Sequence, residues 1–232
     1  MKLTQVKGNT WVLEGFELIP LYRLDNNKCI LLDTGLEQER EDIENTLLEA
    51  GLTPAGILCS HAHIDHAGNN RYFQEKYRIP VALTAREAGM CASILSLKCY
   101  FLLLPPDMVE RESSNLVHTP DVIIPDQDGP FSFAGAEFTI LHTPGHSVGH
   151  VCTVTPDNVC YAGDALLSQE MLTSKLPYCL SHRMGMESRE KLRGLDCDLV
   201  VMAHRGIARR EELEGLIDAN QALALRRAGE IL

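Results

Sequence analysis

Residues 60–68 read Ser60-His61-Ala62-His63-Ile64-Asp65-His66-Ala67-Gly68 and place three histidines and one aspartate within six positions. No helix or strand needs that composition for its own stability. Imidazole nitrogens and carboxylate oxygens together are, however, the ligands that zinc, iron or manganese accept in proteins. The stretch therefore predicts a metal site rather than a solvated polar turn.

The position of this cluster in the chain supports the same interpretation. Residues 55–59 form an apolar run typical of a buried strand, and residues 69–77 predict a helix. Loops held at such a strand-to-helix turn commonly carry chemistry. His61, His63 and Asp65 alternate and should point one way, so the adjacent His66 must point another way. Donors aimed in two directions favour two neighbouring metals over one.

Composition limits the classes of partner. The 232 residues suffice for one large domain, and a hydrophobic content of 45% allows a substantial core. The net charge of -11 leaves no basic footprint for a nucleic acid and disfavours an anionic membrane surface. The eight cysteines form no C-x-x-C pair, and the N-terminus lacks a signal-peptide pattern. We therefore expect reduced thiols and a cytoplasmic protein.

Runs of apolar or alternating residues predict many short strands interleaved with helices. The expected strands span residues 3–6, 10–14, 16–24, 28–32, 55–59, 80–83, 121–124, 131–133, 137–141, 151–155, 159–162 and 198–202. Helices are expected over residues 37–50, 69–77, 187–195 and 209–231, with another beginning at Ala85 after Thr84. This order indicates an α/β fold: a four-layer αββα sandwich of two mixed β-sheets with helices on the outer faces, formed as one domain over residues 1–232.

Residues 90–118 depart from the strand pattern. An apolar stretch up to Leu104 is followed by Pro105-Pro106 and is too short to cross a bilayer. The stretch predicts a helical insertion at about residues 85–118, with residues 111–115 as a polar surface turn. Three interpretations stay open for it: packing on the core, a lid over the site, or the contact of a homodimer.

Further candidate ligands follow other strand-like runs. Residues that follow strands along one edge of packed sheets can meet in a single cleft. The candidate ligands are His61, His63, Asp65, His66, His146, Asp164 and His204. Seven are too many for one tetrahedral metal, and they suit two metals with one bridging carboxylate. The absence of cysteine from this set argues against a closed structural zinc site.

The order of these motifs resembles the metallo-β-lactamase fold superfamily, in its glyoxalase II-like and lactonase-like hydrolase branch. The H-x-H-x-D-H turn is followed by T-P-G-H at residues 143–146, by Gly163-Asp164 and by a late histidine. The resemblance assigns one metal to His61, His63 and His146, the other to Asp65, His66 and His204, and the bridge to Asp164. Asp33 matches the aspartate that orients a ligand histidine in this superfamily.

The resemblance implies a metal-dependent hydrolase of EC class 3. Two divalent ions, Zn²⁺ by default and iron or manganese otherwise, would hold a hydroxide that Asp65 orients for attack on a small ester, thioester or lactone. The apolar residues 90–104 favour an acyl substrate. The C-terminal extension of glyoxalase II, which carries its glutathione-binding residues, has no counterpart here. The alternatives are a mononuclear iron persulfide dioxygenase and, less favoured by the acidic charge, a phosphodiesterase.

Several residues outside the ligand set are secondary candidates. Lys175 and Tyr178 follow the bridging aspartate and are candidate substrate contacts, with Tyr178 a donor to a developing oxyanion. His142 and His150 flank His146 and could support the ligands or touch substrate. The pattern indicates surface or loop positions for His118 and His182.

Overall fold

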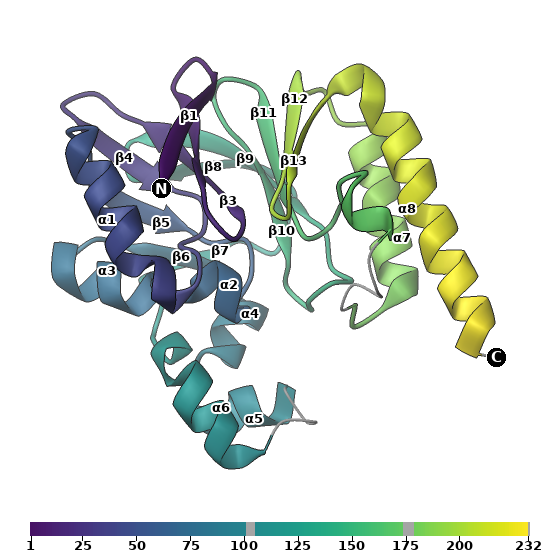
Figure 1. Cartoon of the computed structure of the whole chain (residues 1–232), viewed down its shortest axis with the longest axis horizontal. Helices are drawn as coiled ribbons and strands as arrows, with labels where there is room; N and C mark the ends of the chain where they lie inside the picture. The colour runs from purple at the N-terminus through teal and green to yellow at the C-terminus, as the bar shows by residue number, and fades with distance from the viewer. Residues whose placement is uncertain (101–104, 174–178, 232) are drawn as a thin grey trace.

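The computed structural model describes residues 1–100, 105–173 and 179–231. Two mixed β-sheets lie face to face, and helices cover the outer face of each sheet (Figure 1). This arrangement confirms the predicted αββα sandwich. The ends of several strands from both sheets meet along one edge, which positions the candidate site.

The first sheet has seven strands in the order β1-β2-β3-β4-β5-β6-β7. Its first four strands pair antiparallel, and β4 to β7 pair parallel. Because the loops that follow β4 and β5 leave the same edge, they bring residues 33 and 61 together. The strands are β1 (Lys2–Lys7), β2 (Thr10–Glu14), β3 (Leu18–Arg23), β4 (Lys28–Leu31), β5 (Thr53–Leu58), β6 (Val81–Thr84) and β7 (Val122–Ile124).

The second sheet has six strands in the order β13-β12-β11-β10-β9-β8. Its strand β10 pairs antiparallel with both β9 and β11, and β11 pairs parallel with β12. Strands β9, β11 and β12 therefore run in one direction and end at one edge. The strands are β8 (Gly129–Phe133), β9 (Ala136–His142), β10 (Val151–Val154), β11 (Val159–Gly163), β12 (Leu199–Met202) and β13 (Gly206–Arg209).

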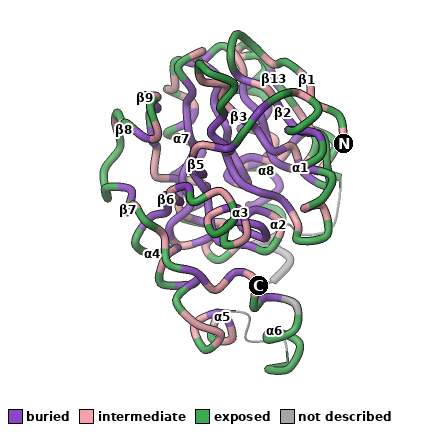
Figure 2. The backbone as a smooth tube through the Cα atoms, turned by 90° about the vertical axis from the view of Figure 1, so that its left-hand side faces the viewer, coloured by how far each residue is buried: buried purple, intermediate pink, exposed green. Residues whose placement is uncertain are grey.

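Helices flank the two sheets, and apolar side chains fill the three spaces between the layers. Phe73 belongs to the cluster between the first sheet and its helices, and Phe138 belongs to the cluster between the two sheets. Leu192 belongs to the cluster between the second sheet and its helices. Buried segments accordingly concentrate in the strands (Figure 2). The helices beside the first sheet are η1 (Glu37–Glu39), α1 (Arg40–Glu49), α2 (Ile64–Ala67), α3 (Asn70–Tyr77) and α4 (Ala85–Met90), and those beside the second are η3 (Met171–Thr173), α7 (His182–Arg193) and α8 (Arg210–Ile231).

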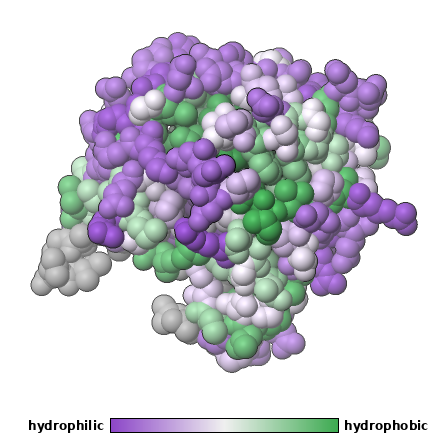
Figure 3. Space-filling model, turned by 180° about the vertical axis from the view of Figure 1, so that it is seen from behind, coloured by the Kyte–Doolittle hydropathy of each residue, from purple (hydrophilic) through white to green (hydrophobic). Residues whose placement is uncertain are grey.

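A small helical projection extends from the sandwich after α4. It contains α5 (Ile94–Tyr100), α6 (Pro106–Ser113) and η2 (Ser114–Leu116), and it forms the lowest part of the molecule in Figures 1 and 2. Seen from behind, its surface carries hydrophobic and hydrophilic atoms together (Figure 3). Leu97 and Val109 are buried inside it, whereas Leu95 is 72% exposed. Residues 101–104, the end of the predicted apolar stretch, lie outside the described residues.

Several local predictions were wrong. The polar turn expected at residues 111–115 is instead the end of α6 followed by η2. His118 lies in a loop, one of the two placements expected for it, but its side chain is buried. Strand β8 begins two residues before the expected strand at residues 131–133, because it includes Gly129-Pro130, and its sheet-edge position tolerates proline. Helix α7 begins earlier than expected because Ser181 caps it by accepting the backbone N–H of Met184.

Edge strand β13 was not predicted, because its sequence Gly-Ile-Ala-Arg offers only a short alternation.

None of the described helices combines the length and apolar character that crossing a bilayer requires.

Adjacent leucines in α1 test the outer apolar layer. Leu47 is 1% exposed and Leu48 is 76% exposed. We expect Leu47→Ala to lower the free energy of unfolding by about 2–5 kcal/mol, because it leaves a cavity under the first sheet. Leu48→Ala should change it by less than about 0.5 kcal/mol. Urea unfolding of the two variants measures both values, and equal losses would contradict this packing.

Candidate metal centre

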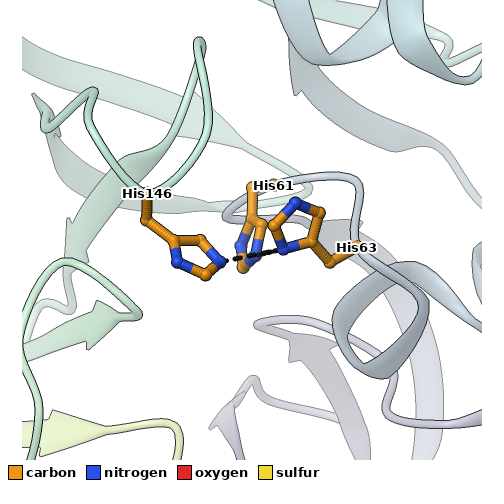
Figure 4. Close-up of side chains that lie close together, drawn as sticks. All are labelled: His61, His63 and His146. Atoms are coloured by element: carbon orange, nitrogen blue, oxygen red, sulfur yellow. Dashed lines mark hydrogen bonds between the residues drawn. The ribbon is translucent and has the colours of Figure 1, made fainter. Parts of the chain in front are cut away.

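Three imidazole nitrogens converge between the two sheets (Figure 4). His61 and His63 come from the loop after β5, and His146 comes from the loop between β9 and β10. His63 Nδ1 lies 3.0 Å from His61 Nε2 and 2.8 Å from His146 Nε2. A tetrahedral ion with bonds of about 2.0–2.1 Å would separate its nitrogen ligands by about 3.3 Å, so a small adjustment fits zinc here.

The outward nitrogens of His61 and His63 each have a hydrogen-bond partner. Ser60 Oγ donates to Asp33 Oδ2 at 2.6 Å, so it must accept from His61 Nδ1 at 2.9 Å. His63 Nε2 lies 2.7 Å from the hydroxyl of Tyr100 in α5, which the sequence did not single out. A donor role for each outward nitrogen leaves a lone pair on each inward one, as a metal ligand requires.

A second group contains Asp65, His66 and His204. His204 Nε2 lies 3.4 Å from Asp65 Oδ2. His66 Nε2 is buried and has no hydrogen-bond partner within the described chain, and the nearest Asp65 oxygen is 3.9 Å away. A buried nitrogen left unpaired beside oxygens too distant for a hydrogen bond is the arrangement expected around an absent ion. The donors of both groups therefore fit divalent metals.

Asp164 lies between the two groups. Its Oδ2 is 3.2 Å from His146 Nε2 in the first group, and its Oδ1 is 3.5 Å from His204 Nε2 in the second. Its backbone N–H donates to His150 Nε2 at 3.1 Å. The preceding Gly163 has φ +50°, and a Cβ there would lie 2.6 Å from His150 Nε2, so glycine is required at this bend.

The carboxylate of Asp33 connects both groups. Its Oδ1 accepts the N–H of Ser60 at 2.6 Å, and its Oδ2 accepts Ser60 Oγ at 2.6 Å, Tyr161 OH at 2.6 Å and His66 Nδ1 at 2.8 Å. Asp33 itself is fully buried with φ +72°. It orients His66 directly and His61 through Ser60. No sequence signal marked Tyr161, which lies in the apolar run of β11.

The electrostatic environment differs between the two groups. Burial, reinforced by neighbouring histidines, holds the pKa values of His61 and His63 well below their usual range. Burial also lowers the pKa of His66, but Glu17, Asp65 and Asp164 outweigh it and raise that pKa well above normal. Burial raises the pKa of Asp65, yet His66 and His204 bring it to about 2. His61 and His63 are thus neutral and Asp65 ionised at neutral pH, as metal ligation requires.

Two buried glutamates near the site were missed by sequence reasoning. Glu17 Oε2 lies 3.1 Å from His66 Nδ1, and burial raises the pKa of Glu17 well above its usual range. Glu87 accepts the N–H of Ala62 at 2.9 Å through one oxygen. Its other oxygen accepts Ser147 Oγ and the N–H of Gly149, each at 2.7 Å. Glu87 therefore ties the loop of His61 and His63 to the loop of His146.

The remaining candidates divide into near and distant residues. His150 supports the site through Asp164, and its Nδ1 lies 2.8 Å from Thr143 Oγ1. His142 lies away from the ligands, since its Nε2 contacts the carbonyl of Pro125 at 2.9 Å. His182 is the first residue of α7. The proposed substrate contacts Lys175 and Tyr178 lie outside the described residues.

Comparison with known proteins agrees with this geometry. The family model of the metallo-beta-lactamase superfamily matches residues 4–204, and the chain belongs to that superfamily. It is 30% identical to a probable metallo-hydrolase, YqgX of Bacillus subtilis, over 62% of this chain and 64% of the relative. It is 25% identical to the hydroxyacylglutathione hydrolase GloC of Haemophilus influenzae, over 78% and 82% of the two chains.

Solved structures show the same fold. A beta-lactamase from Chitinophaga pinensis superposes with a TM-score of 0.76 at 17% identity, covering 98% of this chain and 94% of that one. A metallo-beta-lactamase family protein from Thermus thermophilus gives a TM-score of 0.66 at 25% identity, covering 89% and 75%. The resemblance expected from the motifs is therefore confirmed at the level of superfamily and fold.

The position of Asp164 between the two groups can be tested by its removal. We expect Asp164→Ala to lower the bound zinc content, because a candidate ligand that faces both groups disappears. The matched control is His142→Ala, which should retain the wild-type content because His142 is remote from the ligands. Elemental analysis after dialysis against buffered zinc measures both. Equal metal losses in the two variants would show that the ligand set is misassigned.

The cross-loop contacts of Glu87 predict a stability effect. Glu87→Gln places an amide NH₂ against a backbone or hydroxyl donor, so we expect the free energy of unfolding to fall by about 1–3 kcal/mol. The control Glu75→Gln alters an exposed partner of Arg71 and should change it by less than about 0.5 kcal/mol. Urea unfolding of the metal-free variants gives both values. Wild-type stability for Glu87→Gln would show that the hydrogen bonds of Glu87 to the two loops do not stabilise the fold.

Proposed function

We propose that this protein is a hydrolase that binds two divalent ions, Zn²⁺ by default, and cleaves a small ester, thioester or lactone. The observation that carries the proposal is the position of Asp164, whose two oxygens face His146 and His204 from the two ligand groups. A carboxylate in that position suits a bridge between adjacent ions. His61, His63 and His146 would hold one ion, and Asp65, His66 and His204 the other.

The residues of the chain would prepare the site for attack on a carbonyl carbon. When bound, two such ions lower the pKa of water toward neutrality and polarise a substrate oxygen. Asp65, ionised and with 21% of its side chain exposed, would orient the attacking water and accept its proton. The ring of Phe16, a 59% exposed residue, lies edge-on to His204, with the two ring centroids 5.8 Å apart. An exposed apolar ring beside a candidate ligand supports an acyl substrate.

The names of two relatives support the cleavage of an ester or thioester bond. The Haemophilus relative, and another from Serratia proteamaculans, are named hydroxyacylglutathione hydrolases. An acyl-glutathione is a thioester, so the names support acyl cleavage by a similar centre. The Serratia match covers only 47% of that relative, and this chain's own acyl donor is part of the proposal.

We further propose that the protein works on a small molecule in the cytoplasm, without a nucleic-acid or membrane partner. All eight cysteines are free thiols, and six of them are buried. The strongly acidic balance supports the exclusion of polyanionic partners. The exposed Leu95 on the helical projection is consistent with a homodimer contact, which sedimentation can test.

Turnover in the absence of oxygen tests the proposed reaction. Zinc-loaded protein should hydrolyse at least one substrate in a panel of esters, thioesters and lactones under anaerobic conditions. Asp65→Asn should reduce kcat by at least about a hundredfold, because it weakens proton transfer and ligation. The control Asp126→Asn alters an exposed aspartate and should keep wild-type rates.

The same assay distinguishes the alternative chemistry. The iron-loaded protein is given glutathione persulfide and oxygen in parallel. Oxygen consumption by the iron form, with no hydrolysis by either form, would overturn the hydrolase in favour of a persulfide dioxygenase.

A further inference from the structure

A pocket opens beside the metal centre, between α7 and the C-terminal helix α8. His146 and Asp164 of the candidate centre form part of its wall, and Arg189 of α7 forms another part. The pocket contains about 540 Å³ of space when the part open to solvent is included. Much of the remaining lining is apolar and comprises Ala165, Leu167, Leu223 and Ala224.

Arg189 is a buried cation without an anionic partner among the described residues. It is 9% exposed, and its one hydrogen bond within the described chain joins Nε to Gln221 Oε1 at 3.1 Å. The adjacent Glu190 bonds instead to Arg193 and Gln221. Buried charges in proteins are normally paired, because an unpaired one loses its hydration without compensation. The terminal nitrogens of Arg189 therefore remain available to an incoming anion.

Gly185, one turn earlier in α7, lies against the guanidinium of Arg189. A Cβ at Gly185 would lie 3.4 and 3.7 Å from the two terminal nitrogens of Arg189. Gly185 also packs against the backbone that carries His146, since a Cβ at Gly145 would lie 2.4 Å from Gly185 Cα. The guanidinium is thus held near the loop of His146, and the pocket has a cationic part close to the metal centre.

We infer that this pocket binds the carboxylate group of an apolar acyl substrate and that Arg189 is its anchor. The inference rests on the proposed function, because His146 and Asp164 belong to the proposed catalytic centre. A guanidinium pairs with a carboxylate through two parallel hydrogen bonds. Arg189 is the sole permanent cation among the described lining residues, and Asp164 lines the pocket at its metal end.

The overall charge of the protein strengthens the need for such an anchor. A net charge of -11 repels anionic substrates at long range, so their capture requires a local cation. The apolar residues between the two ends would contact the hydrocarbon part of the substrate. An uncharged acyl compound would leave the guanidinium unpaired in the pocket and would bind less tightly.

Hexanoate and its neutral analogue hexanol test this inference without requiring turnover. Calorimetric titration of the zinc-loaded full-length protein should show hexanoate binding at least about tenfold more tightly than hexanol. Arg189→Met should weaken hexanoate at least about tenfold and leave hexanol within about twofold, because one charge-assisted pair is lost. Arg189→Lys keeps the charge but not the paired hydrogen bonds, so its hexanoate affinity should fall between those of the wild type and Arg189→Met.

The control removes the same charge elsewhere in the helix. Arg183, with a side chain 86% exposed, is also in α7, and Arg183→Met should bind hexanoate like the wild type. Unchanged hexanoate affinity in Arg189→Met, or no preference of the wild type for hexanoate over hexanol, would overturn the inference. If Arg189→Met does not fold, Arg189→Lys and Arg189→Gln replace it. Weaker hexanoate binding by Arg189→Gln than by Arg189→Lys would support the inference, and equal binding by the two variants would overturn it. Absence of hydrolysis across the substrate panel would instead overturn the proposed function.

Discussion

The structure of the site depends on one buried carboxylate, that of Asp33. It accepts hydrogen bonds from Ser60, His66 and Tyr161, which come from different strands and loops of both sheets. A buried carboxylate is stable only when such donors surround it, because each replaces hydration that burial removes. Through these contacts one residue sets the orientation of two candidate ligands and joins the sheets at the edge where the site lies.

Glu87 provides a second connection of the same kind. It accepts donors from the loop of His61 and the loop of His146, so it fixes the distance between ligands that belong to different sheets. The two carboxylates together hold the loops in place without contributing to the candidate ligand set. This separation between ligands and supporting residues explains how His63 Nδ1 lies within about 3 Å of nitrogens of both His61 and His146 in a stable fold.

Much of the fold and ligand set could be predicted because the signals are local. Short apolar runs mark the strands, and His61 to His66 form a dense motif within one loop. The supporting residues could not be predicted in this way. Glu17 and Tyr161 lie in ordinary strand-like sequence, and their roles arise from contacts with residues far away in the chain. Glu87 follows Thr84 in a pattern typical of a helix start, which concealed its contacts with the ligand loops.

The distribution of ligands along the chain has a consequence for synthesis. His61, His63, Asp65 and His66 belong to the first half, whereas His146, Asp164 and His204 belong to the second. A nascent chain that has emerged only through the first sheet exposes four of the seven candidate donors, while Tyr161, which donates to Asp33, and Ser147, which donates to Glu87, are still missing. The complete set of candidate ligands can assemble only after residue 204 has left the ribosome. Any metal acquired earlier would have an incomplete set of ligands and would exchange readily with the surrounding pool.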